Sequence, residues 1–135
     1  MTDLEKLISL AYKARKAFEK VAEIDRWKPN LSGLCFDASC FLRRLARENG
    51  IETELGKGDG HYFVLYGNVV IDITATQFGK LDHVCVLPLE EASKIGDFWK
   101  LYYSYKEYPI HQSCQEKIAR EELEKLETEE HRLEL

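Results

Sequence analysis

Three residues that together support nucleophilic catalysis lie in the middle of the chain, in the order Cys35, His61 and Asp72. A cysteine thiolate can attack a carbonyl carbon, and a histidine can carry the proton. A carboxylate can fix the tautomer of the imidazole and stabilise its charged form. This order predicts thiol-based acyl transfer on an amide, with Cys35 as nucleophile, His61 as general acid/base and Asp72 as the acid that orients it.

The position of Cys35 favours a reactive thiol. A helix is expected to start near Ser32 or Gly33, with Ser32 as its N-cap, and to end near Glu48. Free amides and the helix dipole at its first turn would lower the pKa of the Cys35 thiol, and the amides could bind an oxyanion. The alternative is a small buried apolar residue, which free cysteine often is.

The two strands that would carry the other residues are predicted by a hairpin signal. The segments 61–66 and 69–74 are rich in β-branched and aromatic residues, and Gly67-Asn68 separates them. Two such loop residues between two such segments are typical of a tight β-hairpin.

The register of this hairpin brings His61 and Asp72 together. Counting back from the turn, Phe63 lies opposite Asp72, and His61 lies opposite Thr74. His61 and Asp72 then share one face, with Cβ atoms about 7–8 Å apart on the diagonal. Asp72 also interrupts an apolar strand, where a buried carboxylate needs a partner. The alternative is an aspartate that caps the backbone or lies exposed at an edge.

Three segments resemble the papain-like and transglutaminase-like cysteine enzymes, and in particular the small bacterial papain-fold proteins that include toxin domains and glutamine deamidases. The segments are Gly33-Leu34-Cys35-Phe36-Asp37-Ala38-Ser39, Gly60-His61-Tyr62-Phe63-Val64 and Ile71-Asp72-Ile73-Thr74-Ala75-Thr76-Gln77-Phe78. The resemblance covers about residues 31–78. It implies a papain-like α+β fold, in which the cysteine helix packs on an antiparallel sheet flanked by N- and C-terminal helices.

The resemblance implies a thiol hydrolase that works through a thioester on a protein or peptide substrate, without a cofactor. Protein glutamine side chains (deamidase) and peptide bonds (thiol protease) both fit, and an amine acceptor would make the enzyme a transglutaminase. Papain proteases carry an oxyanion-binding glutamine upstream of the cysteine. Here Asn30 and Gln77 are the candidates for that role. The alternative function is an inactive papain-like domain that binds a partner protein through its terminal helices.

The surrounding segments fit one domain of 135 residues. We expect an N-terminal helix over 1–28, a core over 31–108 and a charged helix over 113–135. Capping boxes at Thr2 with Glu5 and at Ser113 with Glu116 mark the two helix starts. Within the core the remaining expectations are a weak strand over 51–55, a flexible glycine loop over 56–60, a strand over 83–87, a helical turn or two over 89–95 and a strand over 98–108.

Composition narrows the function classes. The net charge is −5, and the segment 116–135 supplies −4 of it with eight Glu against four Lys and Arg, which argues against nucleic-acid binding. No apolar run is long enough for a membrane span. Without a secretory signal pattern, the four cysteines are expected to be reduced and the protein cytoplasmic, with signal-less export left open. Cys40, Cys85 and Cys114 are expected to pack, and no Cys-x2-Cys pair predicts a metal site.

Overall fold

The two long helices at the start of the chain form largely where the sequence predicts them. In the computed structural model, which describes residues 1–134, α1 spans Asp3–Ile24 and α2 spans Cys35–Glu48. The Thr2 hydroxyl accepts the Glu5 amide at 3.1 Å, while the Glu5 carboxylate accepts the Thr2 amide. The predicted capping box at the start of α1 is therefore confirmed.

The start of α2 differs from the expectation. Ser32 is not its cap, because the N-cap position belongs to Leu34, whose side chain makes no capping bond. The backbone reaches this point through a tight turn in which Leu31 (φ 64°) and Gly33 (φ 89°) are left-handed. The Leu34 amide donates to the Leu31 carbonyl at 3.0 Å. This turn delays the helix so that Cys35 is its first residue.

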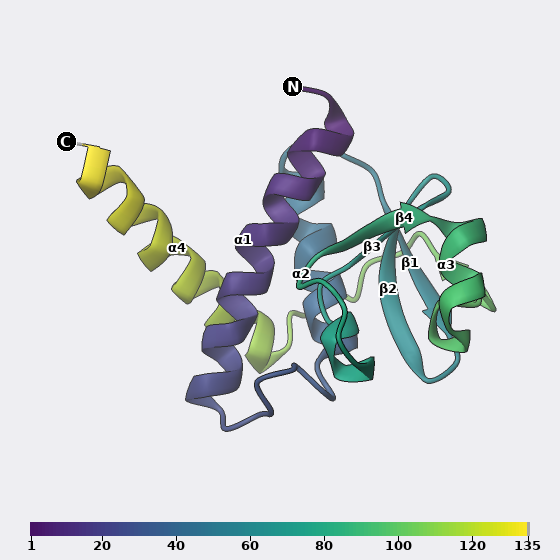
Figure 1. The fold of residues 1–135 in the computed structure, drawn as a ribbon. Helices are drawn as coiled ribbons and strands as arrows, with labels where there is room; N and C mark the ends of the chain where they lie inside the picture. Colours follow the sequence, from purple (N-terminus) through teal and green to yellow (C-terminus); the bar gives the residue numbers. More distant parts are fainter. Residues whose placement is uncertain (135) are drawn as a thin grey trace.

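The described residues form an α+β arrangement of four α-helices and one antiparallel five-stranded sheet with the order β4-β3-β2-β1-β5 (Figure 1). The strands are β1 (Glu54–Gly58), β2 (His61–Tyr66), β3 (Val69–Asp72), β4 (Cys85–Pro88) and β5 (Tyr103–Tyr105). The other elements are η1 (Ala75–Phe78), α3 (Leu89–Ile95), η2 (Asp97–Trp99) and α4 (Cys114–Glu134), where η marks a 3-10 helix.

The β2–β3 hairpin has the predicted register. Tyr66 lies opposite Val69, and Val64 lies opposite Ile71, with Gly67-Asn68 as the two loop residues. Strand β3 ends at Asp72, two residues before the predicted end. The count that placed His61 and Asp72 on one face of neighbouring strands is therefore sound.

Several strand limits were predicted wrongly. Strand β1 begins at Glu54 and takes in Gly56 to Gly58, so most of the expected glycine loop is paired with β2. The expected strand over 98–108 is reduced to β5, because Asp97–Trp99 form a 3-10 turn. Strand β4 begins at Cys85, two residues later than expected. The helix over 89–95 is confirmed as α3.

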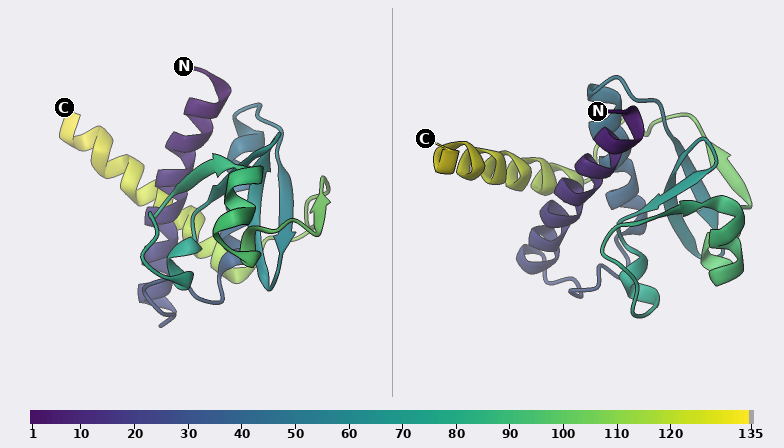
Figure 2. Two further views of the ribbon diagram at one scale, coloured as in Figure 1. Left: turned by 45° about the vertical axis from the view of Figure 1, so that its right-hand side comes forward. Right: turned by 45° about the horizontal axis from the view of Figure 1, so that its top comes forward.

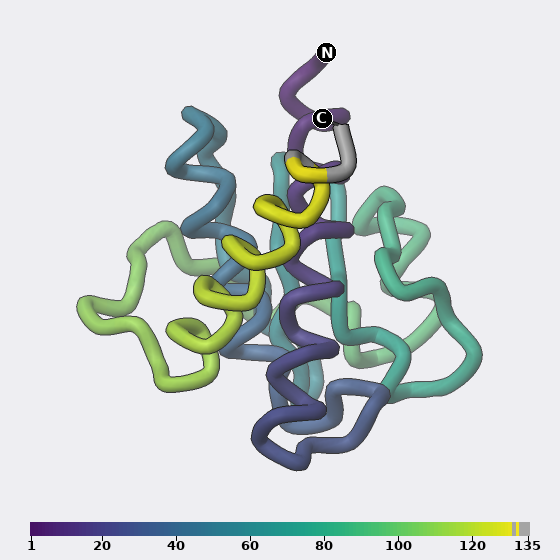
Figure 3. The backbone as a smooth tube through the Cα atoms, turned by 90° about the vertical axis from the view of Figure 1, so that its left-hand side faces the viewer, coloured from purple at the N-terminus to yellow at the C-terminus, as the bar shows by residue number. Residues whose placement is uncertain are grey.

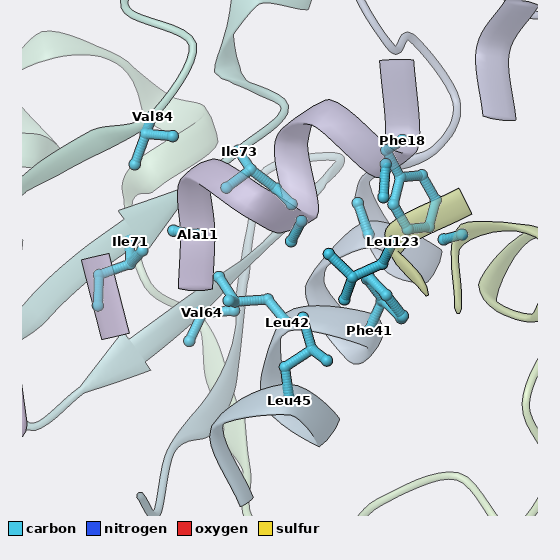
Figure 4. Close-up of a cluster of buried hydrophobic side chains, with 14 of the residues drawn as sticks. Ala11, Phe18, Phe41, Leu42, Leu45, Val64, Ile71, Ile73, Val84 and Leu123 are labelled. Carbon is cyan, nitrogen blue, oxygen red and sulfur yellow. The ribbon is translucent and has the colours of Figure 1, made fainter. Parts of the chain in front are cut away.

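The sheet lies between two helical layers (Figure 2). On one face, α1 and α2 bury a large apolar cluster that includes Phe18, Phe41, Leu42, Val64 and Ile71 (Figure 4). On the other face, α3 and η2 cover a smaller cluster that includes Phe63, Leu65, Val70, Ala92 and Trp99. Residues of β2 and β3 alternate between the two clusters, as the two-residue period of a strand requires.

Helix α4 returns across α1 and ends away from the sheet (Figures 1 and 3). Its predicted capping box is confirmed, because the Glu116 amide donates to Ser113 Oγ at 3.2 Å and the Ser113 amide donates to the Glu116 carboxylate at 3.3 Å. The Arg44–Glu116 ion pair, 2.9 Å and buried, holds this end against α2. Leu135, the predicted last residue of this helix, lies outside the described residues. In the described part of the chain, every helix is too short or too polar to cross a membrane.

Candidate active site

The predicted site residues lie at the ends of one helix and two strands, which meet at one place in the fold. Cys35 opens α2, His61 opens β2, and Asp72 closes β3. Helix α2 is held over the start of β2, where Ser39 Oγ donates to the Tyr62 carbonyl at 3.4 Å. The first turn of the helix therefore faces the first residues of the strand.

His61 and Asp72 form a buried pair. His61 Nε2 lies 2.6 Å from Asp72 Oδ2, and the two side chains are 0% and 1% exposed. A bond this short in a buried place fixes the imidazole orientation and favours its protonated form. The predicted proximity of these two residues is confirmed, while their part in catalysis stays a prediction.

The Asp72 carboxylate is satisfied by further donors. Its Oδ1 accepts the Thr74 amide at 2.8 Å and the Thr74 hydroxyl at 3.3 Å. Its Oδ2 also accepts the indole N–H of Trp99 at 2.7 Å. These donors explain how a carboxylate can stay buried inside an apolar strand. Sequence reasoning missed Trp99, which lies on η2 and is brought to Asp72 by the tertiary fold alone.

The Cys35 thiol is half-buried and acidic. Burial alone would raise its pKa, but the neighbouring His61 side chain and the Tyr62 backbone outweigh burial and hold the pKa of Cys35 below its ordinary value. Because Asp72 occupies His61 Nε2, Nδ1 is the ring nitrogen left for the thiol. Nδ1 is buried and has no hydrogen-bond partner within the described residues, so a hydrogen bond to Cys35 is not formed in this structure. Catalytic hydrogen bonds often tighten only when substrate is bound.

The imidazole is correspondingly basic. Burial would lower the pKa of His61, but the hydrogen bond to Asp72 and the neighbouring Cys35 thiol raise it to about 9. A thiol with a lowered pKa beside an imidazole with a raised pKa is the arrangement that favours a thiolate–imidazolium pair. Such a pair would supply both the nucleophile and the proton donor for acyl transfer.

The other cysteines lack this environment. Burial raises the pKa of Cys40 to about 12 and that of Cys85 to about 11, so both thiols stay protonated. Cys114 is exposed at the start of α4, which corrects the expectation that it packs. Cys35 therefore differs from Cys40 and Cys85 in acidity and from Cys114 in its histidine partner.

Aromatic rings enclose the imidazole. Phe78 meets the His61 ring edge to face at 4.8 Å between centroids, and Phe98 lies at 6.0 Å. Phe78 and Phe98 stack on each other at 4.1 Å. These rings keep water away from the His61–Asp72 hydrogen bond, and the exclusion of water strengthens that bond.

The two candidate oxyanion donors from the sequence are engaged locally. Asn30 Oδ1 accepts the Ser32 amide at 3.1 Å, and Gln77 Nε2 donates to the Thr74 carbonyl at 3.0 Å. Their roles toward a substrate stay predictions. The backbone offers other donors, because the amides of Cys35 and Phe36 have no acceptor among the described residues.

In the described part of the chain, no three His, Cys, Asp or Glu side chains are placed to hold a metal ion together. Comparison with known protein families, with curated proteins and with solved structures finds no match to this chain. The functional argument therefore depends on the geometry of the site.

Proposed function

We propose that this chain is a cysteine-dependent amidohydrolase or acyl transferase of papain-like type, with Cys35, His61 and Asp72 as its triad. The observation that carries the proposal is the buried 2.6 Å bond between His61 and Asp72, beside a Cys35 thiol of lowered pKa. A cysteine helix packed on an antiparallel sheet supports the papain-like assignment.

The first half of the reaction forms a thioester. The Cys35 thiolate attacks the amide carbonyl carbon, and the carbonyl electron pair moves to the oxygen. In this mechanism the amide of Cys35, which has no acceptor at the start of α2, donates to that oxyanion. When the intermediate collapses, the C–N bond breaks, and His61 Nδ1 gives its proton to the leaving nitrogen.

The second half regenerates the enzyme. Neutral His61 takes a proton from water as the water oxygen attacks the thioester carbon, and the C–S bond breaks to release the acid and the Cys35 thiolate. An amine in place of water would give a transferred amide. Asp72 holds the imidazole in place through both steps and stabilises its charged form.

Glutamine side chains and peptide bonds are the proposed substrates, since both present a planar amide to the half-buried thiol. The test is intact-mass analysis of candidate substrate proteins incubated with the enzyme. Deamidation gives the small mass gain of an amide converted to an acid, and proteolysis gives fragments. Cys35→Ala is the matched control and should leave every substrate unchanged. Equal substrate turnover by wild type and Cys35→Ala would contradict the proposal.

A further inference from the structure

One charged side chain lies within the buried face of α1. Arg15 is 3% exposed, and the other buried residues of this helix are apolar. A guanidinium is costly to remove from water, and apolar replacements of buried ion pairs are often neutral or stabilising. Packing alone therefore does not account for Arg15, and the bonds that it makes are the feature to explain.

Arg15 binds the segment that follows Asp72. Its Nη1 donates to the Ile73 carbonyl at 2.9 Å and to the Thr76 hydroxyl at 2.8 Å. Ile73 directly follows Asp72, the last residue of β3. The Arg15 Nε lies 3.2 Å from Glu19 Oε2, one helical turn away, and this ion pair offsets its charge. Arg15 thus fixes the segment after β3 against α1.

Thr76 connects this segment to the one that precedes Cys35. The Thr76 hydroxyl accepts a hydrogen bond from Arg15 and donates one to the Asn30 carbonyl at 3.1 Å. Because a hydroxyl has a single proton, the bond from Arg15 directs that proton toward Asn30. The Thr76 hydroxyl therefore joins the segment after Asp72 to the segment before Cys35.

The backbone between Asn30 and Cys35 is held firmly. Asn30 Oδ1 accepts the Ser32 amide at 3.1 Å, and the Leu31 carbonyl accepts the Leu34 amide at 3.0 Å. Leu31 and Leu34 are both 0% exposed and belong to the large apolar cluster. A shift of Asn30 would therefore move Cys35, the first residue of α2.

We propose that Arg15, acting through Thr76, is a positioning residue that holds the Cys35 thiol beside His61. The inference rests on the proposed function, because it assigns Arg15 a part in the same triad. Arg15 bonds to the chain on either side of the site and not to the three triad side chains. It acts on the reaction through the placement of the nucleophile.

The His61–Asp72 pair has supports of its own. The register of the β2–β3 hairpin aligns the two strands, and the Thr74 amide and the Trp99 indole both donate to the Asp72 carboxylate. Loss of Arg15 should therefore leave this pair formed and displace the nucleophile from it.

The test is the pH dependence of Cys35 alkylation by iodoacetamide in full-length Arg15→Met, which keeps an unbranched side chain and loses every donor. We expect the rate at pH 7 to fall about three- to tenfold, since one pKa unit changes the thiolate population up to about tenfold. The first rise in the rate should move to higher pH. Lys16→Met, at the next and exposed position of α1, is the matched control and should keep the wild-type profile.

Thr76→Val tests the connection with a milder change, and it serves also if Arg15→Met does not fold. It removes only the hydroxyl, so the rate should fall about two- to tenfold, the effect of one hydrogen bond. Thr128→Val, at an exposed position on α4, is its control. The double variant of Arg15→Met and Thr76→Val should be no slower than Arg15→Met alone, because both changes break one connection.

The outcomes separate this inference from the proposed function. Urea unfolding first identifies the variants that are folded. If folded Arg15→Met or Thr76→Val keeps the wild-type rate and pH profile while wild-type Cys35 reacts fast, the inference is wrong and the proposed function stands. Additive losses in the double variant would overturn the connection through Thr76. A wild-type Cys35 no faster than N-acetylcysteine would overturn the proposed function and this inference with it.

Discussion

Trp99 donates its indole N–H to Asp72 Oδ2 at 2.7 Å, on the same oxygen that holds His61 Nε2. The two residues are 27 positions apart, and both are buried. Trp99 therefore fixes the carboxylate in the position that orients the imidazole. It touches no reacting atom, so we treat it as a positioning residue for the triad.

Replacement of Trp99 by Phe removes one donor from a buried carboxylate. We expect the free energy of unfolding to fall by about 1–3 kcal/mol, the cost of an unmet buried hydrogen bond, plus a share from lost packing. With less competition for Oδ2, the bond from His61 should strengthen, so the pKa of His61 should rise above its wild-type value. Urea unfolding and imidazole NMR titration measure the two effects.

Trp27→Phe is the matched control for this variant, since Trp27 is 37% exposed and lies outside the triad. Trp27→Phe should have the same His61 pKa as the wild type. An unchanged His61 pKa in Trp99→Phe would assign Trp99 to packing alone.

The pH dependence of Cys35 alkylation follows from the two shifted pKa values. The pKa of Cys35 is lowered, so its thiolate is present above that lowered pKa and is lost as the pH falls through it. The pKa of His61 is about 9, so the imidazolium is present at neutral pH and is lost as the pH rises through about 9. Iodoacetamide rates should therefore show a first rise below the pKa of an ordinary thiol and a second rise near pH 9, when the thiolate loses its partner. N-acetylcysteine, with one ordinary rise, is the reference compound.

Asp72→Asn should weaken the ion pair. Asp72 supplies the largest contribution that raises the pKa of His61, so its loss should lower that pKa. The charge of Asp72 itself raises the pKa of Cys35, but it acts less strongly than His61, so the loss of the charged imidazole should dominate and the pKa of Cys35 should rise. The alkylation rate of Cys35 at pH 6–7 should fall about tenfold or more, since a shift of one pKa unit changes the thiolate population about tenfold. Glu23→Gln, which removes an exposed partner of Lys20, is the control and should change nothing at Cys35. An Asp72→Asn variant as reactive as the wild type would show that Asp72 does not act through His61.

Cys35→Ala and Cys40→Ala should have opposite effects. Cys35 is half-buried at a helix start, so its replacement should change the free energy of unfolding by less than about 1 kcal/mol while abolishing turnover. Cys40 is 1% exposed, so its replacement should cost about 1 kcal/mol of stability and spare turnover. Chemical unfolding measures the stability of each variant, and the intact-mass assay measures its turnover of substrate. The account fails if Cys40→Ala, and not Cys35→Ala, loses activity.

Local signals explain which parts of the fold and site could be predicted. The Gly67-Asn68 turn fixes the register of β2 and β3, and parity along the strands then places His61 near Asp72. The capping boxes fix where α1 and α4 begin. Each of these signals is contained within a few residues of the feature it predicts.

Features set by tertiary contacts could not be predicted in this way. The aromatic content of 98–108 suggests a long strand, but Trp99 is drawn into the 3-10 turn beside Asp72, and Arg43 binds the carbonyls of Lys106 and Glu107 that would otherwise extend the sheet. The left-handed backbone at Leu31 likewise has no glycine to signal it and displaces the start of α2 to Cys35.

The most direct test of the triad is competition among the four cysteines of the folded wild-type protein. Each is labelled with iodoacetamide at pH 7, and the rates are read by peptide mass mapping. Cys35 should react at least about tenfold faster than Cys114, although Cys114 is the more exposed thiol, because a thiolate is the reactive form. Cys40 and Cys85 should stay unlabelled. If Cys114 reacts fastest and Cys35 reacts no faster than N-acetylcysteine, the thiolate–imidazolium pair does not exist, and an inactive binding domain becomes the better account.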